Sequence, residues 1–285
     1  MATLCETFRS TAFNTYERLM AAKSIDYQPL EETFTDNIML DLKLKHPVEI
    51  FTRPFNKRVE GVNGADWEWW LTNAAEDNWL GLRVQAKILN FKPNEYSHLH
   101  HKVGKAKKAY QLANLKRESA KAGMVPLYCF YSYGDITSGA CGSFGHAAEA
   151  FGCSLTSLAH VESLQAAGEK KGFDDVMEKA SPWHCLVCCS GFGPGDLPTR
   201  AWNFLQGALD IKLPKPRKPR QSNVDGVSRA LPSKPAIGPR GQPPHYVRAI
   251  VGGEAVRPDQ VPKKVAGVFV IKGHADTSIG PGQHR

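Results

Sequence analysis

Three polar residues have types and spacing suited to metal-assisted chemistry: Asp66, Gln85 and Lys87. Carboxylate and amide oxygens are ligands that a hard divalent cation accepts, and a lysine places positive charge beside them. Gln85 and Lys87 stand two residues apart, so in a β-strand their side chains share one face. Asp66 joins them only if its own segment forms a strand that pairs with theirs.

The sequence supplies two such strands in succession. Residues 80–89 alternate between apolar and polar side chains, so one face would build the core while the other presents Gln85 and Lys87. Residues 65–72 show the same alternation, with Asp66, Glu68 and Trp70 on one face and Trp67 and Trp69 on the other. We expect an antiparallel hairpin that brings the carboxylate, the amide and the amine together.

Further elements are expected on both sides of this hairpin. Apolar residues at helical spacing predict helices near residues 3–22 and 29–45, and β-branched and aromatic residues predict a strand at 48–53. A helix is expected over residues 103–122, followed by a buried strand at 125–133. Without the first helix, the order is helix, three strands, helix, strand.

This order, together with the spans EETFTD, GADWEWW, LRVQAK and VPLYCFY, resembles an uncharacterised bacterial family of the PD-(D/E)xK, or restriction-endonuclease-like, nuclease superfamily. In its Mrr-like branch, Gln can replace the acidic residue of the third strand. The resemblance covers residues 28–132. It implies an α/β fold with an αβββαβ core, a mixed central sheet flanked by helices, an N-terminal helix and a C-terminal extension. It also implies a metal-dependent DNA endonuclease of bacterial genome defence.

The resemblance also implies a role for each site residue. Asp66 would be the principal metal ligand, and Gln85 would supply a neutral oxygen ligand or orient a metal-bound water. Lys87 would stabilise the nucleophile or the transition state. We expect Glu32, on the first core helix, as the fourth catalytic and metal-binding residue, although acidic groups also favour a helix start for electrostatic reasons. Mg²⁺ or Mn²⁺ is the expected cofactor.

Gln85 keeps a second interpretation open. A neutral residue at an acidic position removes one negative charge from the metal site. The alternative is therefore a catalytically inactive nucleic-acid-binding protein on the same fold. A third interpretation is a scaffold or small-molecule protein in which the polar strand face has no catalytic role.

Basic charge points to a polyanionic partner, because the formal net charge is +8. Lys105 and Lys108 on the expected helix, and Arg83 on the polar strand face, are the predicted nucleic-acid contacts. A solvated lysine face would explain the helix equally well. DNA is favoured over RNA, and double-strand cleavage by a single-site nuclease would call for a homodimer.

The chain is expected to divide into three parts. These are a nuclease-like domain at 1–211, a Pro/Gly-rich basic linker at 212–244, and an extension at 245–285 whose strand AGVFVIKG returns to the sheet edge. No apolar run reaches the roughly 18 residues of a membrane span, and no apolar block of a signal peptide is present. These features predict a cytoplasmic protein.

The cysteines and tryptophans are assigned to packing. Seven cysteines without an export signal predict reduced thiols rather than a disulfide framework. Residues 181–190 are predicted as a short buried strand, and their His184 and cysteines lack the matched pair that a zinc site needs. Tryptophans at strand spacing predict core packing; these are Trp67, Trp69, Trp70 and Trp79.

Overall fold

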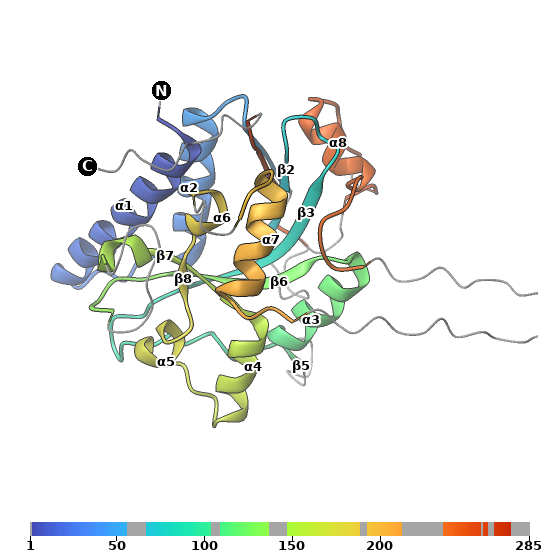
Figure 1. Ribbon diagram of the computed structural model, residues 1–285. Coiled ribbons are helices and arrows are strands. Elements are labelled where there is room, and N and C mark those ends of the chain that lie inside the picture. Colours follow the sequence, from blue (N-terminus) through green and yellow to red (C-terminus); the bar gives the residue numbers. More distant parts are fainter. Residues whose placement is uncertain are drawn as a thin grey trace, which may run out of the picture.

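A mixed β-sheet with helices on both faces organises the molecule (Figure 1). The computed structural model describes residues 2–55, 67–103, 109–136, 147–188, 193–212, 236–257, 259–261 and 265–274. Within these residues the sheet has seven strands in the order β1-β9-β2-β3-β6-β7-β8, and a separate two-stranded sheet pairs β4 with β5. The expected α/β class with a mixed central sheet is confirmed.

The strands of the large sheet are β1 (Ile50–Pro54), β2 (Trp67–Thr72), β3 (Trp79–Ile88), β6 (Val125–Tyr131), β7 (Cys153–Ser157), β8 (Ser181–Pro182) and β9 (Gly267–Lys272). The small sheet consists of β4 (Lys102–Val103) and β5 (Ala109–Tyr110). The α-helices are α1 (Leu4–Ser24), α2 (Glu31–Lys45), α3 (Gln111–Ala122), α4 (Leu158–Ala166), α5 (Phe173–Met177), α6 (Cys185–Cys188), α7 (Leu197–Gly207) and α8 (His245–Val251). A 3₁₀ turn, η2, spans Ala148–Phe151. No helix in the described ranges combines the length and apolarity of a membrane span.

The predicted hairpin lies at the centre of the sheet. β2 and β3 run antiparallel, with Trp67 opposite Val84 and Thr72 opposite Trp79. β3 then pairs in parallel with β6, and α3 makes the connection between them. Gly123 ends α3 in the left-handed conformation at φ 63°, as expected for a helix that stops at glycine.

β9 lies inside the sheet, where the sequence predicted an edge position. It pairs antiparallel with β1 and parallel with β2. Its sequence, GVFVIK, is apolar without alternation, which is the pattern of a strand covered on both faces. Gly267 permits this placement, because a Cβ at that residue would lie 2.5 Å from the Trp67 ring.

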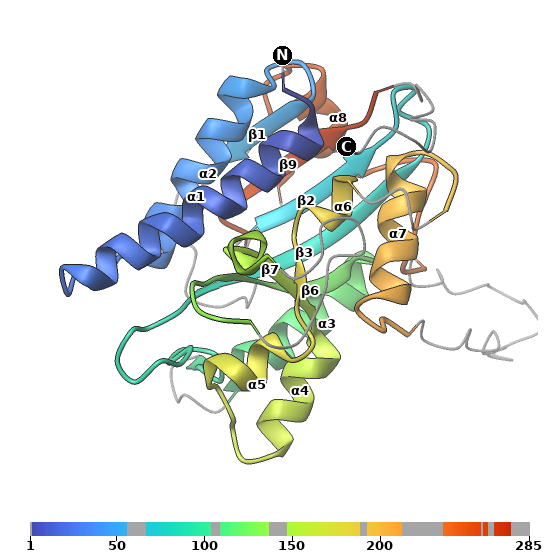
Figure 2. The same ribbon diagram turned by 60° about the vertical axis from the view of Figure 1, so that its left-hand side comes forward.

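Helices cover the two faces of the sheet with separate cores (Figure 2). α1, α2, α6 and α7 pack with the apolar side of the β2–β3 hairpin, which includes Trp69 and Leu82. α3, α4 and α5 pack on the opposite face around Phe130, and α8 covers Trp70 and Val268 on that side. The four tryptophans assigned to the core are all buried. Their burial confirms the prediction that they serve packing.

Three local predictions are wrong. The helix expected from residue 103 begins at Gln111, because residues 102–103 and 109–110 pair as strands before it; residues 104–108 lie outside the described ranges. The strand expected at 181–190 is the two-residue β8 followed by the short helix α6. The linker expected through residue 244 contacts the sheet before its end, since Arg240 forms a backbone bridge with Trp79. Residues 213–235 lie outside the described part.

The prediction of reduced thiols is wrong for one pair. Cys5 at the start of α1 and Cys188 at the end of α6 form a disulfide. They are 183 residues apart in sequence, so no local spacing could indicate that they meet. Among the described residues, Cys129, Cys153 and Cys185 are buried free cysteines.

Candidate functional site

The candidate site lies on β3, next to the first described pair that this strand forms with β2. Trp67, the first described residue of β2, pairs with Val84, so Gln85 and Lys87 follow directly beyond that pair. Asp66 lies outside the described residues, as do Lys105 and Lys108. For these three residues the sequence predictions therefore stand as predictions.

Gln85 and Lys87 are almost completely buried on the same face of β3, at 1% and 5% exposure. Ala86 between them faces the opposite core, as the alternation predicts. A buried ammonium is unfavourable unless an opposite charge compensates it. Lys87 Nζ lies 3.6 Å from Oε2 of Glu31, whose side chain is 24% exposed. Strand β3 and the first turn of α2 thus bring a cation and a carboxylate together.

Glu31, rather than the predicted Glu32, is the α2 carboxylate that reaches Lys87. Glu31 opens the helix and is partly buried, whereas Glu32 is exposed. A signal for this choice is present in the sequence, because Glu31 precedes Phe34 by three residues and Ile38 by seven. Positions at that spacing share one helix face, and both apolar residues are buried. Glu31 therefore joins the candidate site, and the role expected of Glu32 stays a prediction.

Tyr131 of β6 fixes the first turn of α2 against the sheet. Its hydroxyl lies 3.0 Å from Oγ1 of Thr35, and its ring packs 5.9 Å from that of Phe34. Burial is the main cause that raises the pKa of Tyr131 well above its ordinary value. The phenol therefore stays neutral and serves as a hydrogen-bonding anchor for the helix that carries Glu31. Its place within an apolar strand gives no sign of this role in the sequence.

Arg83, predicted to contact nucleic acid, is held inside the protein by a carboxylate. Its Nε and Nη2 donate to Oε1 of the fully buried Glu68 at 3.0 and 2.7 Å. The other oxygen, Oε2, accepts from Trp70 Nε1 at 3.4 Å and from the hydroxyl of Tyr246 on α8. Burial is the main cause of a strongly raised pKa for Tyr246, so its hydroxyl remains a donor. We refer to Glu68, Trp70, Arg83 and Tyr246 as the Glu68 cluster.

Arg240 connects the C-terminal segment to this cluster. Its guanidinium lies over the Trp70 ring, 5.4 Å from the centroid. It also donates to the carbonyl oxygens of Ala122, at 3.2 Å, and Gly123, at the end of α3. Burial lowers the pKa of Arg240, although arginine keeps its charge under such conditions. The positive charge of Arg240 therefore interacts with the Trp70 ring and with the carbonyl groups that end α3.

The described basic residues of α3 are paired with acids. Lys116 Nζ lies 2.6 Å from Glu162, while Arg117 and Lys121 both contact Glu118, at 2.8 and 3.0 Å. Side chains engaged in this way are less available to phosphates than a solvated lysine face would be. The described part of α3 therefore adds little support for a phosphate-binding surface.

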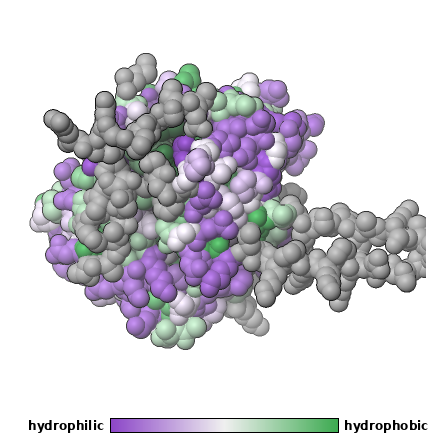
Figure 3. Space-filling view, viewed as in Figure 1, coloured by the Kyte–Doolittle hydropathy of each residue, from purple (hydrophilic) through white to green (hydrophobic). Residues whose placement is uncertain are grey.

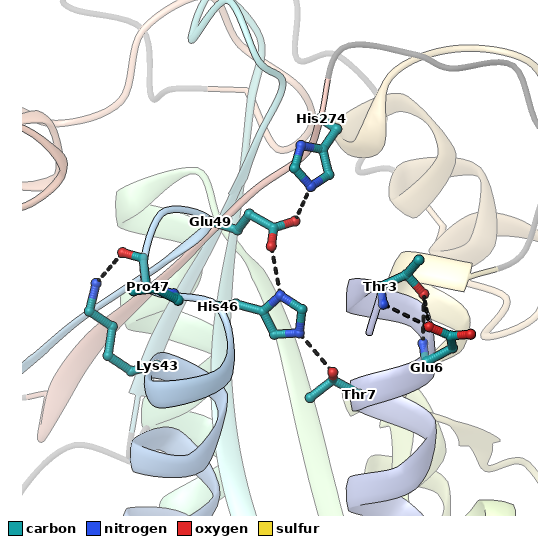
Figure 4. A network of polar contacts seen from close by, with 8 residues as sticks. All are labelled: Thr3, Glu6, Thr7, Lys43, His46, Pro47, Glu49 and His274. Atoms are coloured by element: carbon teal, nitrogen blue, oxygen red, sulfur yellow. Dashed lines mark hydrogen bonds and ion pairs between the residues drawn. The ribbon is translucent and has the colours of Figure 1, made fainter. Parts of the chain in front are cut away.

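A second polar network joins three distant segments (Figure 4). The His46 ring at the end of α2 contacts Glu49 through Nδ1 at 2.6 Å and Thr7 of α1 through Nε2 at 2.7 Å. The second Glu49 oxygen lies 2.6 Å from Nε2 of His274, just after β9. Both His46 nitrogens are engaged, so this ring has no position for a metal or a substrate. No group of three or more potential metal-binding His, Cys, Asp or Glu side chains occurs among the described residues.

Fold and contacts together define an α/β protein with a seven-stranded mixed sheet across its described residues, and with a buried lysine facing a carboxylate beyond its central hairpin. A family model described as "Family of unknown function (DUF6615)" matches residues 4–276, so the chain belongs to that family. No curated protein matches the chain.

Proposed function

We propose that this protein is a metal-dependent nuclease that hydrolyses phosphodiester bonds, and specifically a DNA endonuclease. The proposal depends mainly on one observation: Gln85 and Lys87 lie buried on the same face of β3. The first turn of α2 places the Glu31 carboxylate next to Lys87. Burying a lysine beside a carboxylate costs desolvation energy that the ion pair need not recover, so such a pair is weak evidence for a purely stabilising role.

The order and direction of the strands support the same proposal. α2, β1, β2, β3, α3 and β6 follow the αβββαβ order of the restriction-endonuclease-like superfamily. β2 is antiparallel to β3, and β3 is parallel to β6. On this interpretation β9 is an addition, which separates β1 from β2 within the sheet.

The donor groups fit a hard divalent cation. Glu31 offers a carboxylate and Gln85 an amide oxygen, and the proposal adds Asp66 from outside the described residues. Mg²⁺ commonly takes one or two carboxylates and keeps several waters, so this donor set suits it without a protein cage. When bound, such an ion would neutralise phosphate charge and lower the pKa of a coordinated water.

The protein's own residues would complete the reaction around that ion. Lys87, fixed on a central strand, would donate to the attacking water or to the phosphate oxygen that gains charge in the transition state. Gln85 would orient the water through its amide, and Asp66 and Glu31 would hold the metal. The burial of Gln85 and Lys87 restricts their rotamers, so little reorganisation is needed when the substrate arrives.

A cleavage assay tests this proposal directly. Supercoiled plasmid DNA and single-stranded RNA would be incubated with the full chain in Mg²⁺, Mn²⁺ or EDTA. We expect DNA nicking in either metal, none in EDTA, and a loss of at least about 10²-fold in Lys87→Met and Asp66→Asn. Lys92→Met is the matched control, because Lys92 is exposed and pairs only at the surface with Asp26. Cleavage that persists in both site variants would contradict the proposal.

Gln85 favours a second candidate function, a binding protein that has lost cleavage. This neutral residue is buried at the position where the superfamily commonly carries a metal-binding acid. If the wild-type chain binds DNA but cuts in no divalent metal, the binder is favoured. The Gln85→Glu variant distinguishes the two functions. If the protein lacks only an acidic metal ligand, a carboxylate at this position should introduce metal-dependent cleavage.

A further inference from the structure

The exposed apolar residues of this protein are confined to one part of the fold. Within the described ranges, every large hydrophobic side chain that is at least half exposed lies between residues 20 and 48, on or beside α1 and α2. These residues are Met20, Ile25, Tyr27, Leu30, Leu40, Leu44 and Val48, at 50% to 75% exposure. Hydrophilic residues cover most of the described surface in the view of Figure 3. Scattered apolar residues are ordinary on a monomer, whereas a concentration of them marks an interaction surface.

These residues form two groups at opposite ends of α2. The first group lies at the turn of the α1–α2 hairpin and includes Ile25, Tyr27 and Leu30; Figures 1 and 2 show this turn at the outer margin of the molecule. The second group follows the outer side of α2 at helical spacing and includes Leu40 and Leu44. At 1.5 Å per residue, the two groups are roughly 20 Å apart along the helix.

We propose that this surface binds a second copy of the same chain in a two-fold dimer, with the two α2 helices antiparallel. A two-fold axis near the middle of α2 places the turn group of each copy on the Leu40–Leu44 group of the other. Both contacts form at once, because the spacing is identical in the two copies. A partner of another kind would need to match both groups independently.

The charges of α2 complement each other under the same axis. Its N-terminal half carries the exposed acids Glu32 and Asp36, and its last turn carries Lys43 on the same side of the helix. Asp41 and Lys45 lie on the side of α2 that faces α1. Antiparallel packing places the acidic half of one helix beside the basic end of the other, whereas parallel packing would oppose like charges. The charge pattern therefore selects the orientation in which the apolar groups also match.

The area is sufficient for a dimer of ordinary size. If each of the seven side chains covers on the order of 100 Å², one copy contributes about 700 Å², close to the ~800 Å² per partner of a standard interface. The edge strand β1 adds little to such a contact, because Arg53 and Pro54 occupy its exposed end and disfavour pairing with another strand. We therefore assign the dimer contact to the helices.

Sedimentation velocity of the full chain from about 1 to 100 μM tests the proposal. We expect a dimer whose dissociation constant rises at least tenfold in Leu40→Asp and in Leu44→Asp. Ala113→Asp on the exposed side of α3 is the control, since it adds the same charge away from the surface and should leave the dimer intact. A wild-type chain that stays monomeric overturns the proposal, as does a dimer that persists in both leucine variants.

Exchanging two opposite charges distinguishes a lost dimer contact from a variant that fails to fold. Glu32→Lys and Lys43→Glu should each weaken the dimer, and the double variant should recover most of the loss because the opposite charges face each other again across the axis. Circular dichroism would confirm that each variant is folded. Failure of the double variant to recover would overturn the antiparallel arrangement. The measurement requires no substrate, so it stands apart from the nuclease proposal.

Discussion

Two buried ion pairs lie on the same face of β3, and they are built differently. Arg83 meets the fully buried Glu68 through two nitrogens at 3.0 and 2.7 Å. Four residues later, Lys87 lies 3.6 Å from Glu31, which retains contact with solvent. Charge-assisted hydrogen bonds usually measure about 2.7 to 2.9 Å. The Arg83–Glu68 contact is therefore a direct hydrogen bond, whereas Lys87 and Glu31 are farther apart than such a bond allows.

The difference separates a structural pair from a candidate catalytic one. The Glu68 cluster receives donors from β2, β3 and α8, and a buried network that is fully satisfied makes its surroundings rigid. Lys87 faces a carboxylate that is too distant for a tight bond, so in the proposed nuclease its ammonium would exchange this partner for a phosphate oxygen. We infer that the Glu68 cluster holds the hairpin in place while the Lys87 end performs chemistry.

The largest effect is expected from Glu68→Ala. This change leaves the Arg83 guanidinium buried without its carboxylate, which should lower the free energy of unfolding by about 3–5 kcal/mol. Equilibrium unfolding in guanidinium chloride measures the loss. Glu68→Gln should lose less, because the amide oxygen still accepts hydrogen bonds. A loss below about 1 kcal/mol for the alanine variant would mean that the cluster is not the structural anchor described above.

An intermediate effect is expected from Tyr246→Phe. Removal of the hydroxyl takes one donor from Glu68, which should destabilise the fold by about 1–2 kcal/mol at neutral pH. The pKa of Tyr246 is higher in the folded than in the unfolded protein, so its contribution is present below about pH 10 and is lost as the pH rises further. Unfolding curves at pH 8 and pH 11 should therefore differ less for the variant than for the wild type. An equal difference in both proteins would contradict this role.

The smallest effect on stability is expected from Lys87→Met. The change removes a desolvated ammonium, and the remaining Glu31 carboxylate is solvated in part, so the free energy of unfolding should stay within about 1 kcal/mol of the wild type. Chemical denaturation, together with the cleavage assay, measures stability and activity on the same preparation. A destabilisation as large as that of Glu68→Ala would remove the distinction between the two pairs.

The central hairpin could be predicted because local patterns determine it. Alternation placed Gln85 and Lys87 on one face of β3 and the paired tryptophans in the core. Helix starts favour acids at either Glu31 or Glu32, and the phase of Phe34 and Ile38 is the sequence feature that places Glu31 toward the core. The role expected of Glu32 stays a prediction.

Contacts between distant segments could not be predicted in the same way. Glu68 meets Tyr246, and Trp70 meets Arg240, across more than half of the chain. No local pattern marks these pairs, and Arg240 stands in a stretch whose proline and glycine content resembles a linker. The Cys5–Cys188 disulfide is hidden for the same reason. The composition of a segment indicates how that segment behaves in isolation. Arg240 and Tyr246 instead take their positions from contacts with the sheet.

The position of β9 also bears on how the protein is made. Trp67 of β2 pairs with Gly267 of β9, and among the described strands β9 lies between β2 and β1 in the sheet. At about 5–20 residues per second, a ribosome completes β9 roughly 10–40 s after β2. During that interval the edge of β2 lacks its neighbour, so the sheet closes only after β9 has emerged. An unpaired strand edge can pair with other chains, so the delay exposes β2 to wrong pairing until β9 arrives.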